Sequence, residues 1–227
     1  MGKPSGKTVL VTGVADPIGR ACALALAADG ARLVCAGDES AARDAAAAVT
    51  ETGAYARGVA HGPTSEPDWQ RLMADIKGAE GRLDAFVNFG QATLNKPVAE
   101  TSLADLRAIE EACIVAPWLG LKSVIAAMRK SGGGSIINVS GALTSGEVGG
   151  AAERASAGAL RVMTQAAALE CGQARDKIRI NIILADPGIV TPDEVAQATV
   201  FLASDASSFM TGADVVLGTA VAAEAPQ

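Results

Sequence analysis

The chain has 227 residues, of which 49% are hydrophobic and 19% are charged, a composition typical of an ordered globular protein. Its formal net charge of -6 and its pI near 4.9 disfavour nucleic acid or an anionic membrane as a partner. No apolar run reaches the roughly 20 residues of a membrane helix, and the N-terminus lacks the apolar stretch of a secretory signal. We therefore expect a cytoplasmic protein without membrane contact.

Apolar segments of strand length alternate with segments of helical periodicity along the chain. The predicted strands are 7–13, 31–37, 54–60, 83–90, 134–141, 178–188 and 213–218. The predicted helices are 18–30, 39–53, 66–78, 103–130, 151–172 and 193–204. Apolar strands alternating with helices indicate a parallel sheet covered on both faces, and right-handed crossovers make it a doubly wound Rossmann-type sheet of seven strands. Without a linker or repeat in the sequence, we expect one domain, residues 1–227.

The four cysteines, Cys22, Cys35, Cys113 and Cys171, are far apart and form no Cys-x-x-Cys pair, so we interpret them as small buried residues. The single histidine, His61, lies in a segment rich in glycine and proline, where we expect a solvated loop. No metal site is predicted from these residues.

A glycine-containing turn, TGVADPIG at residues 12–19, joins the first strand to the first helix, where a dinucleotide pyrophosphate would bind at the helix N-terminus. Further segments agree with this turn in order and spacing: 83–90, 134–141, 153–160, 178–192 and 194–218. Together they resemble the short-chain dehydrogenase/reductase family over essentially the whole chain. The resemblance implies a catalytic tetrad of Asn, Ser, Tyr and Lys, in which the lysine lowers the tyrosine pKa and holds the ribose.

The tetrad positions implied by this resemblance hold other residues: Cys113 for asparagine, Gly141 for serine, Glu153 for tyrosine and Ala157 for lysine. Glutamate is normally ionised at neutral pH and cannot donate a proton as a phenol does. Ser140 stands one position before the serine site. The resemblance therefore implies that the family's own catalytic residues are lost, and no catalytic residue is assigned.

The implied cofactor turn is also degenerate, at Gly13, Asp16, Pro17 and Gly19. Pro17 replaces the middle glycine, adding a ring and removing an amide donor, and Asp16 places a negative charge where phosphates would lie. We expect no cofactor on this chain.

Other cofactor positions implied by the resemblance differ as well. Gly37 stands where an acidic residue would hold an NAD ribose, and the Asp38 that follows it either substitutes or caps the next helix. Gly62 stands at the aspartate expected near adenine, and the segment after the fourth strand is shortened to Asn88-Phe89-Gly90. The substrate lid is predicted to be shortened, since helix 193–204 follows Pro187-Gly188 almost at once.

Helices 103–130 and 151–172 correspond to those that form a four-helix dimer interface in the resembled family. The leading prediction is a catalytically inactive pseudo-subunit that pairs through them with an active homologue in a hetero-oligomer, a heterotetramer in which NAD(P) is held by the partner. In pairing with an active homologue, the predicted pseudo-subunit resembles the inactive subunits of heteromeric members of the family. One example is the 2-[hydroxy(phenyl)methyl]succinyl-CoA dehydrogenase of anaerobic toluene degradation.

Two alternatives stay open. One is an oxidoreductase with an altered active site that uses Glu153 as a base, against the interpretation of Glu153 as a solvated residue paired with Arg154 or Arg161. The other is a sensor that binds a nucleotide without turnover, for which Trp69 and Trp118 would be fluorescent probes.

Overall fold

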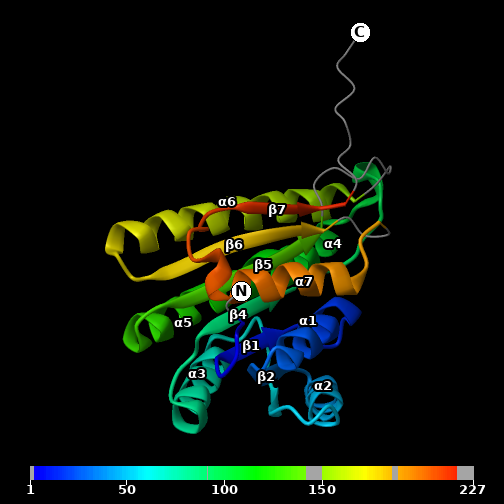
Figure 1. Ribbon diagram of the computed structural model, residues 1–227. Helices are drawn as coiled ribbons and strands as arrows, with labels where there is room; N and C mark the ends of the chain where they lie inside the picture. Colours follow the sequence, from blue (N-terminus) through cyan, green and yellow to red (C-terminus); the bar gives the residue numbers. More distant parts are fainter. Residues whose placement is uncertain (1–2, 91, 142–149, 186–188, 219–227) are drawn as a thin grey trace.

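Seven parallel strands form one sheet in the order β3-β2-β1-β4-β5-β6-β7 (Figure 1). The computed structural model describes residues 3–90, 92–141, 150–185 and 189–218. The strands are β1 (Thr8–Thr12), β2 (Arg32–Gly37), β3 (Ala56–Ala60), β4 (Ala85–Phe89), β5 (Gly134–Gly141), β6 (Ile178–Ala185) and β7 (Asp214–Leu217). The doubly wound sheet predicted from the sequence is confirmed.

The strand order reverses between β1 and β4, which pair directly from Val9 opposite Ala85 to Val11 opposite Val87. Chain connections leave this point in opposite directions, β2 and β3 on one side and β5 to β7 on the other. Ligands of open parallel sheets bind in the crevice beyond the carboxyl ends of the strands at such a reversal.

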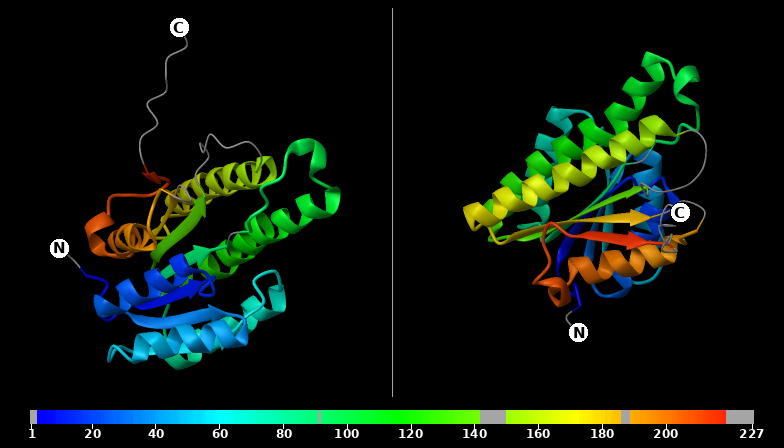
Figure 2. Two further views of the ribbon diagram at one scale, coloured as in Figure 1. Left: turned by 90° about the vertical axis from the view of Figure 1, so that its right-hand side faces the viewer. Right: turned by 90° about the horizontal axis from the view of Figure 1, so that it is seen from above.

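Helices cover both faces of the sheet (Figures 1 and 2). The helices are α1 (Pro17–Ala28), α2 (Glu39–Thr50), α3 (Glu66–Glu80), α4 (Leu103–Glu110), α5 (Ala116–Ser131), α6 (Ala151–Ala174) and α7 (Pro192–Ala203). One buried cluster joins α1, α2 and α7 to alternate strand residues such as Val9, Val11 and Leu33. A second cluster joins α3, α5 and α6 to the intervening residues such as Leu10 and Val34, as the period of two in a strand requires.

The first and last long helices pack against each other although they are far apart in the sequence. The Cys22 sulfur of α1 lies 3.4 Å from the Thr199 hydroxyl oxygen of α7, and both side chains are buried. Thr191 caps the start of α7 reciprocally with Glu194, and Pro192 occupies the first helical turn. This pairing buries the side of α1 that faces α7.

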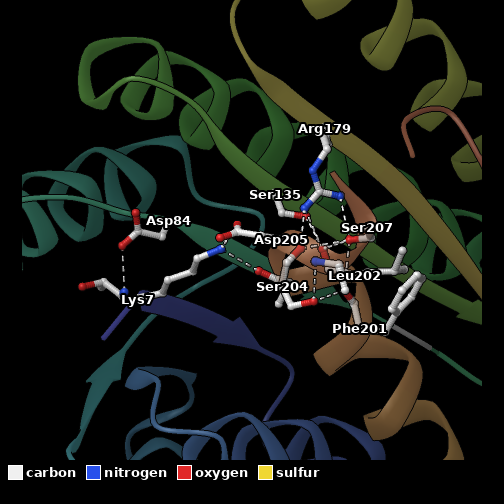
Figure 3. A network of polar contacts seen from close by, with 12 residues as sticks. Lys7, Asp84, Ser135, Arg179, Phe201, Leu202, Ser204, Asp205 and Ser207 are labelled. Carbon is white, nitrogen blue, oxygen red and sulfur yellow. Dashed lines mark hydrogen bonds and ion pairs between the residues drawn. The ribbon is translucent and has the colours of Figure 1, made fainter. Parts of the chain in front are cut away.

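The C-terminal end of α7 is held by a polar network (Figure 3). The Arg179 guanidinium of β6 donates to the carbonyl oxygens of Leu202 at 3.0 Å and Ser204 at 3.1 Å. Lys7 pairs with Asp205, a residue of the short 3-10 helix η3 (Asp205–Ser207), at 2.6 Å. Carbonyls at a helix end have no partner within the helix, so these donors satisfy groups that would otherwise need water.

The single helix predicted over residues 103–130 is interrupted. A π-helical turn, η2 (Glu111–Val115), separates α4 from α5. The turn carries apolar and charged residues much like its neighbours, so its sequence gives no signal of the wider helix, and π-helical turns are frequently found at functional sites.

Among the described residues, one continuous helical stretch, Leu103–Ser131, is long and apolar enough to cross a membrane by length and composition alone, with a mean hydropathy of 1.4 over its most apolar window. A core helix passes the same test. Here α5 packs against α3, α6 and the sheet, as a core helix does.

Candidate active site

A crevice of about 280 Å³ lies beyond the carboxyl ends of β1, β2 and β4, at the reversal of strand order. It combines sheet ends, the turn after β1, the segment after β3 and the π-helical turn. Its lining comprises Thr12 to Asp16, Ala36 to Asp38, His61, Pro63, Trp69, Asn88 to Gly90, Ala112 and Ala116. The predicted turn residues Gly13 and Asp16 therefore share one cavity with Asp38, which follows β2 as the N-cap of α2.

The glycines of the turn are required by close packing. Gly13 has φ +67°, and a Cβ there would lie under 3.0 Å from the carbonyl oxygen of Phe89 on β4. A Cβ at Gly19 would similarly collide with the carbonyl of Gly13. These contacts bring the turn, β4 and α1 together at the floor of the crevice, and they account for both glycines without a ligand.

The N-terminus of α1 already carries an anion. Asp16 is its N-cap, and its carboxylate accepts a hydrogen bond from the amide of Ile18 at 2.8 Å. Pro17 begins the helix and supplies no amide. A phosphate bound at this helix end would compete with the Asp16 carboxylate for the same donors and the same end of the helix dipole.

Asp38 caps α2, which confirms one of the two interpretations of this residue. Its carboxylate accepts from the Ala41 amide at 2.9 Å and from the Ser40 hydroxyl at 2.8 Å. The Ala41 amide and the Ser40 hydroxyl hold the pKa of Asp38 below its usual value. Asp38 also lines the crevice, so a carboxylate stands where a ribose hydroxyl could donate to it.

The expectation of a solvated His61 is wrong, because only 6% of the residue is exposed. Its amide donates to the Gly37 carbonyl at 2.8 Å, which extends the pairing of β3 with β2 by one residue. The His61 ring lies edge-on to Trp69 of α3, with centroids 4.4 Å apart. Burial lowers the pKa of His61 to about 4, so the ring is neutral at pH 7.

Glu153 lies in the first turn of α6, close to the π-helical turn. Its carboxylate accepts a hydrogen bond from the backbone amide of Leu94, and it lies close enough to Cys113 to disfavour the thiolate. Burial is the main cause that raises the pKa of the Cys113 thiol, and the Glu153 charge adds to it. A Cβ at Gly150 would lie 2.8 Å from the second carboxylate oxygen, so this glycine leaves space beside it. Glu153 itself does not line the crevice; Ala112, the neighbour of Cys113, does.

One interpretation of Glu153, its pairing with Arg161, does not match the structure. Arg161 pairs with Asp214 of β7 at 2.6 Å and not with Glu153. The Leu94 amide, from an irregular segment, was missed by sequence reasoning, since no local pattern connects residue 94 with residue 153.

The remaining tetrad positions offer no ionisable group. Gly141 ends β5, and the buried Ser140 before it points to the opposite face of the sheet, so Ser140 does not replace it. Ala157 lies one turn after Glu153 on the same face of α6 and is 7% exposed. No cation therefore stands beside Glu153 in the position that the family's lysine would take.

The lid prediction concerns the connection between β6, which ends at Ala185, and α7, which begins at Pro192. Only residues 186–191 remain for it, and positions 186–188 lie outside the described residues. Because Thr191 already caps α7, the few residues between β6 and α7 are too short a segment to form a helical lid.

An adenosine fits this crevice better than a pyrophosphate does. Its lining is mainly apolar, with Asp38 at the ribose side and the neutral His61 buried beside it. Both ring nitrogens of His61 are buried without a hydrogen-bond partner among the described residues. The Asp16 carboxylate opposes phosphate at the helix end. The residues present thus fit the adenosine half of a dinucleotide. The residues at the phosphate position (Asp16) and at the lysine position near the nicotinamide ribose (Ala157) differ from those of the resembled family.

The sequence model of a family described as short chain dehydrogenase matches residues 7–200. Cyclopentanol dehydrogenase of Comamonas sp. (strain NCIMB 9872) is 32% identical over 96% of this chain and 97% of its own. The (2S)-[(R)-hydroxy(phenyl)methyl]succinyl-CoA dehydrogenase subunit BbsC of Thauera aromatica is 29% identical over 92% of this chain and 91% of its own. A solved short-chain type dehydrogenase/reductase of Mycobacterium marinum superposes with a TM-score of 0.88 at 25% identity, covering 95% of both chains.

These relatives contradict the prediction of a catalytically inactive pseudo-subunit. They are dehydrogenases that match nearly the full chain, and nothing among them marks an inactive branch. The prediction treated the missing tetrad as the loss of any active site, although Glu153 keeps an ionisable group at the tyrosine position. Members of this family normally bind NAD(P), so the expected absence of a cofactor is not supported either. The chain belongs to the short-chain dehydrogenase/reductase family.

Proposed function

We propose that the chain is an oxidoreductase with an altered active site, which interconverts an alcohol and a carbonyl compound and uses Glu153 as its acid–base group. One observation carries the proposal. The Glu153 carboxylate is held by the Leu94 amide at the start of α6, beside the π-helical turn that lines the crevice. The family membership supplies the reaction class.

The role of Glu153 follows from its setting. In the oxidation direction the carboxylate takes the proton of the substrate hydroxyl, and in reduction the carboxyl returns it. The Leu94 amide fixes one oxygen of the Glu153 carboxylate, while Gly150 leaves room at the other. When bound, NAD(P) would supply the hydride acceptor or donor; Asp38 and the apolar crevice walls would hold its adenosine half.

The substrate class comes from the relatives. Those with 32% and 31% identity are named for cyclopentanol and for a 3-beta-hydroxysteroid, both secondary alcohols on a ring. We propose the same class for this chain. The connection between β6 and α7 comprises only residues 186–191, too few for a helical lid over a bulky ring system.

The test is Glu153→Gln, assayed with NAD and NADP against a panel of cyclic secondary alcohols and their ketones. The amide keeps the shape of the side chain and an acceptor for Leu94 but cannot exchange the proton, so kcat should fall by roughly 100-fold or more. Glu170→Gln, an exposed change on the same helix, is the matched control and should leave kcat unchanged. A kcat of Glu153→Gln equal to that of the wild type would contradict the assignment of Glu153 as the acid–base group.

A second candidate is nucleotide binding without turnover. The buried Ala157 favours it, because no cation holds a nicotinamide ribose there. Saturable binding of NADH without conversion of any alcohol or ketone in the panel would select this candidate over the first.

Pairing with another chain of the same fold is a separate proposal. Helices α5 and α6 lie side by side (Figure 2). Each exposes large apolar side chains, Trp118 on α5 and Val162 and Leu169 on α6. We propose that these helices contact a second chain; the pairing through 103–130 and 151–172 that is expected from the sequence stays a proposal. Light scattering of the purified chain measures the outcome: a monomer counts against self-pairing, and copurification with a homologue supports a mixed assembly.

A further inference from the structure

The His61 ring is the most unusual polar group in the crevice. It is 6% exposed, it lines the cavity, and neither ring nitrogen has a hydrogen-bond partner among the described residues. Buried polar groups in folded proteins nearly always have partners, so an orphaned pair calls for an explanation. A ligand in the cavity supplies one.

The position of the ring is fixed from two sides. The His61 backbone is bonded to Gly37 at the end of β2, and its ring rests edge-on against the Trp69 indole. Trp69 is itself held, because its Nε1 donates to the Pro63 carbonyl at 2.8 Å. Neither nitrogen can therefore turn away to a partner elsewhere without breaking this packing.

The chemistry of the site selects the type of ligand. Asp68 and Arg71 of α3 are the charged groups that act on the ring, and burial outweighs both, so the ring stays neutral. A neutral imidazole offers one donor and one acceptor. Asp16 and Asp38, the carboxylates lining the same cavity, disfavour an anion. An apolar slot with a neutral donor–acceptor pair fits the edge of a heteroaromatic base and does not fit a phosphate.

We propose that His61 recognises the adenine base of the nucleotide that binds in this crevice. The proposal deepens the proposed function and rests on it only for the crevice being a nucleotide site. His61 is a binding residue here and takes no part in proton transfer at Glu153.

The closing experiment uses adenosine, which carries no phosphate and cannot be turned over. His61 is the only histidine of the chain, so ¹⁵N-histidine labelling gives two unambiguous ring signals. Adenosine at millimolar concentration should shift the Nδ1 or Nε2 signal of the full-length protein, and nicotinamide mononucleotide should not. No shift with adenosine, or a shift with nicotinamide mononucleotide alone, overturns the proposal.

Affinity is measured by the emission of Trp69 in a Trp118→Phe background, which removes the second tryptophan. His61→Phe keeps a planar ring without donors and should weaken adenosine binding about tenfold. His61→Asn keeps a donor and an acceptor and should recover most of that loss. Equal affinity in wild type and a folded His61→Phe also overturns the proposal.

The two proposals fail separately. Glu153→Gln should bind adenosine as wild type does, because Glu153 does not line the cavity. Activity that depends on Glu153 without an adenosine effect at His61 leaves the oxidoreductase intact and removes only the base recognition.

Discussion

The crevice and the region around Glu153 beside it are built in different ways. On the side of β1, β2 and β3, Gly13 and His61 are positioned by contacts of the backbone with neighbouring strands. In the neighbouring region at the start of α6, the chemistry depends on the side chains of Glu153, Cys113 and Ala157, none of which lines the crevice. The difference teaches that a pocket defined by sheet packing persists when the reactive side chains beside it are replaced.

Gly13→Ala disturbs the contact between the turn after β1 and strand β4 at the floor of the crevice, and it has the largest expected effect. Its methyl group would collide with the carbonyl of Phe89 on β4 at a φ of +67°. We expect the free energy of unfolding to fall by about 4 kcal/mol, since neither backbone can yield without disturbing the sheet. Urea denaturation followed by circular dichroism measures it.

Gly53→Ala is the matched control for that substitution. Gly53 also has positive φ, at +86°, but a Cβ there meets nothing within 4 Å. It should cost only about 1–2 kcal/mol, the price of a left-handed conformation alone. Equal losses at both glycines would show that the contact with Phe89 contributes nothing.

Lowering the pH tests the side of the crevice that holds His61. Burial lowers the pKa of His61 from 6.5 to about 4, so the unfolded chain takes up a proton in this window that the folded chain does not. Stability is therefore complete above pH 6.5 and is lost as the pH falls towards 4, by up to about 3 kcal/mol.

His61→Asn removes this titration and should flatten the pH dependence of the unfolding free energy between pH 6.5 and 4. Lowered carboxyl pKa values, such as that of Asp68, add a loss at still lower pH in both proteins. Parallel curves for wild type and variant in that window would mean that His61 is not held neutral by burial.

Asp16→Ser changes the residue that caps α1 and lines the crevice, and it has the smallest expected effect. Serine still caps α1 but removes the charge from the Ile18 amide. NADH binding should tighten roughly fivefold to tenfold, about 1 kcal/mol, as measured by Trp69 fluorescence. Asp29→Ser, at the other end of α1, removes the same charge and should leave the affinity within twofold.

The fold could be predicted from the sequence because its signals are local. The apolar run at β1 is a fully buried strand and those at β5 and β6 are buried over most of their length, and the caps at Asp38 and Thr191 mark helix starts. The π-helical turn could not be predicted, because Glu111–Val115 has the composition of an ordinary helix.

The site was less predictable because its contacts join distant residues. His61 has the glycine and proline neighbours of a solvated loop, and its burial comes from Gly37 and Trp69. Its one sequence signal is its place directly after the third predicted strand, where sheet-end residues face the crevice. The sequence drew attention to Glu153, but the partner that its carboxylate accepts a hydrogen bond from, Leu94, lies 59 positions away.

The packing of α1 against α7 affects how the chain is made. The two helices are separated by residues 29–191, so the apolar face of α1 leaves the ribosome long before the helix that covers it. At 5–20 residues per second the delay is roughly 8–30 s. During that time the nascent chain exposes an apolar surface, and we expect it to depend on chaperones that shield such surfaces until α7 has been synthesised.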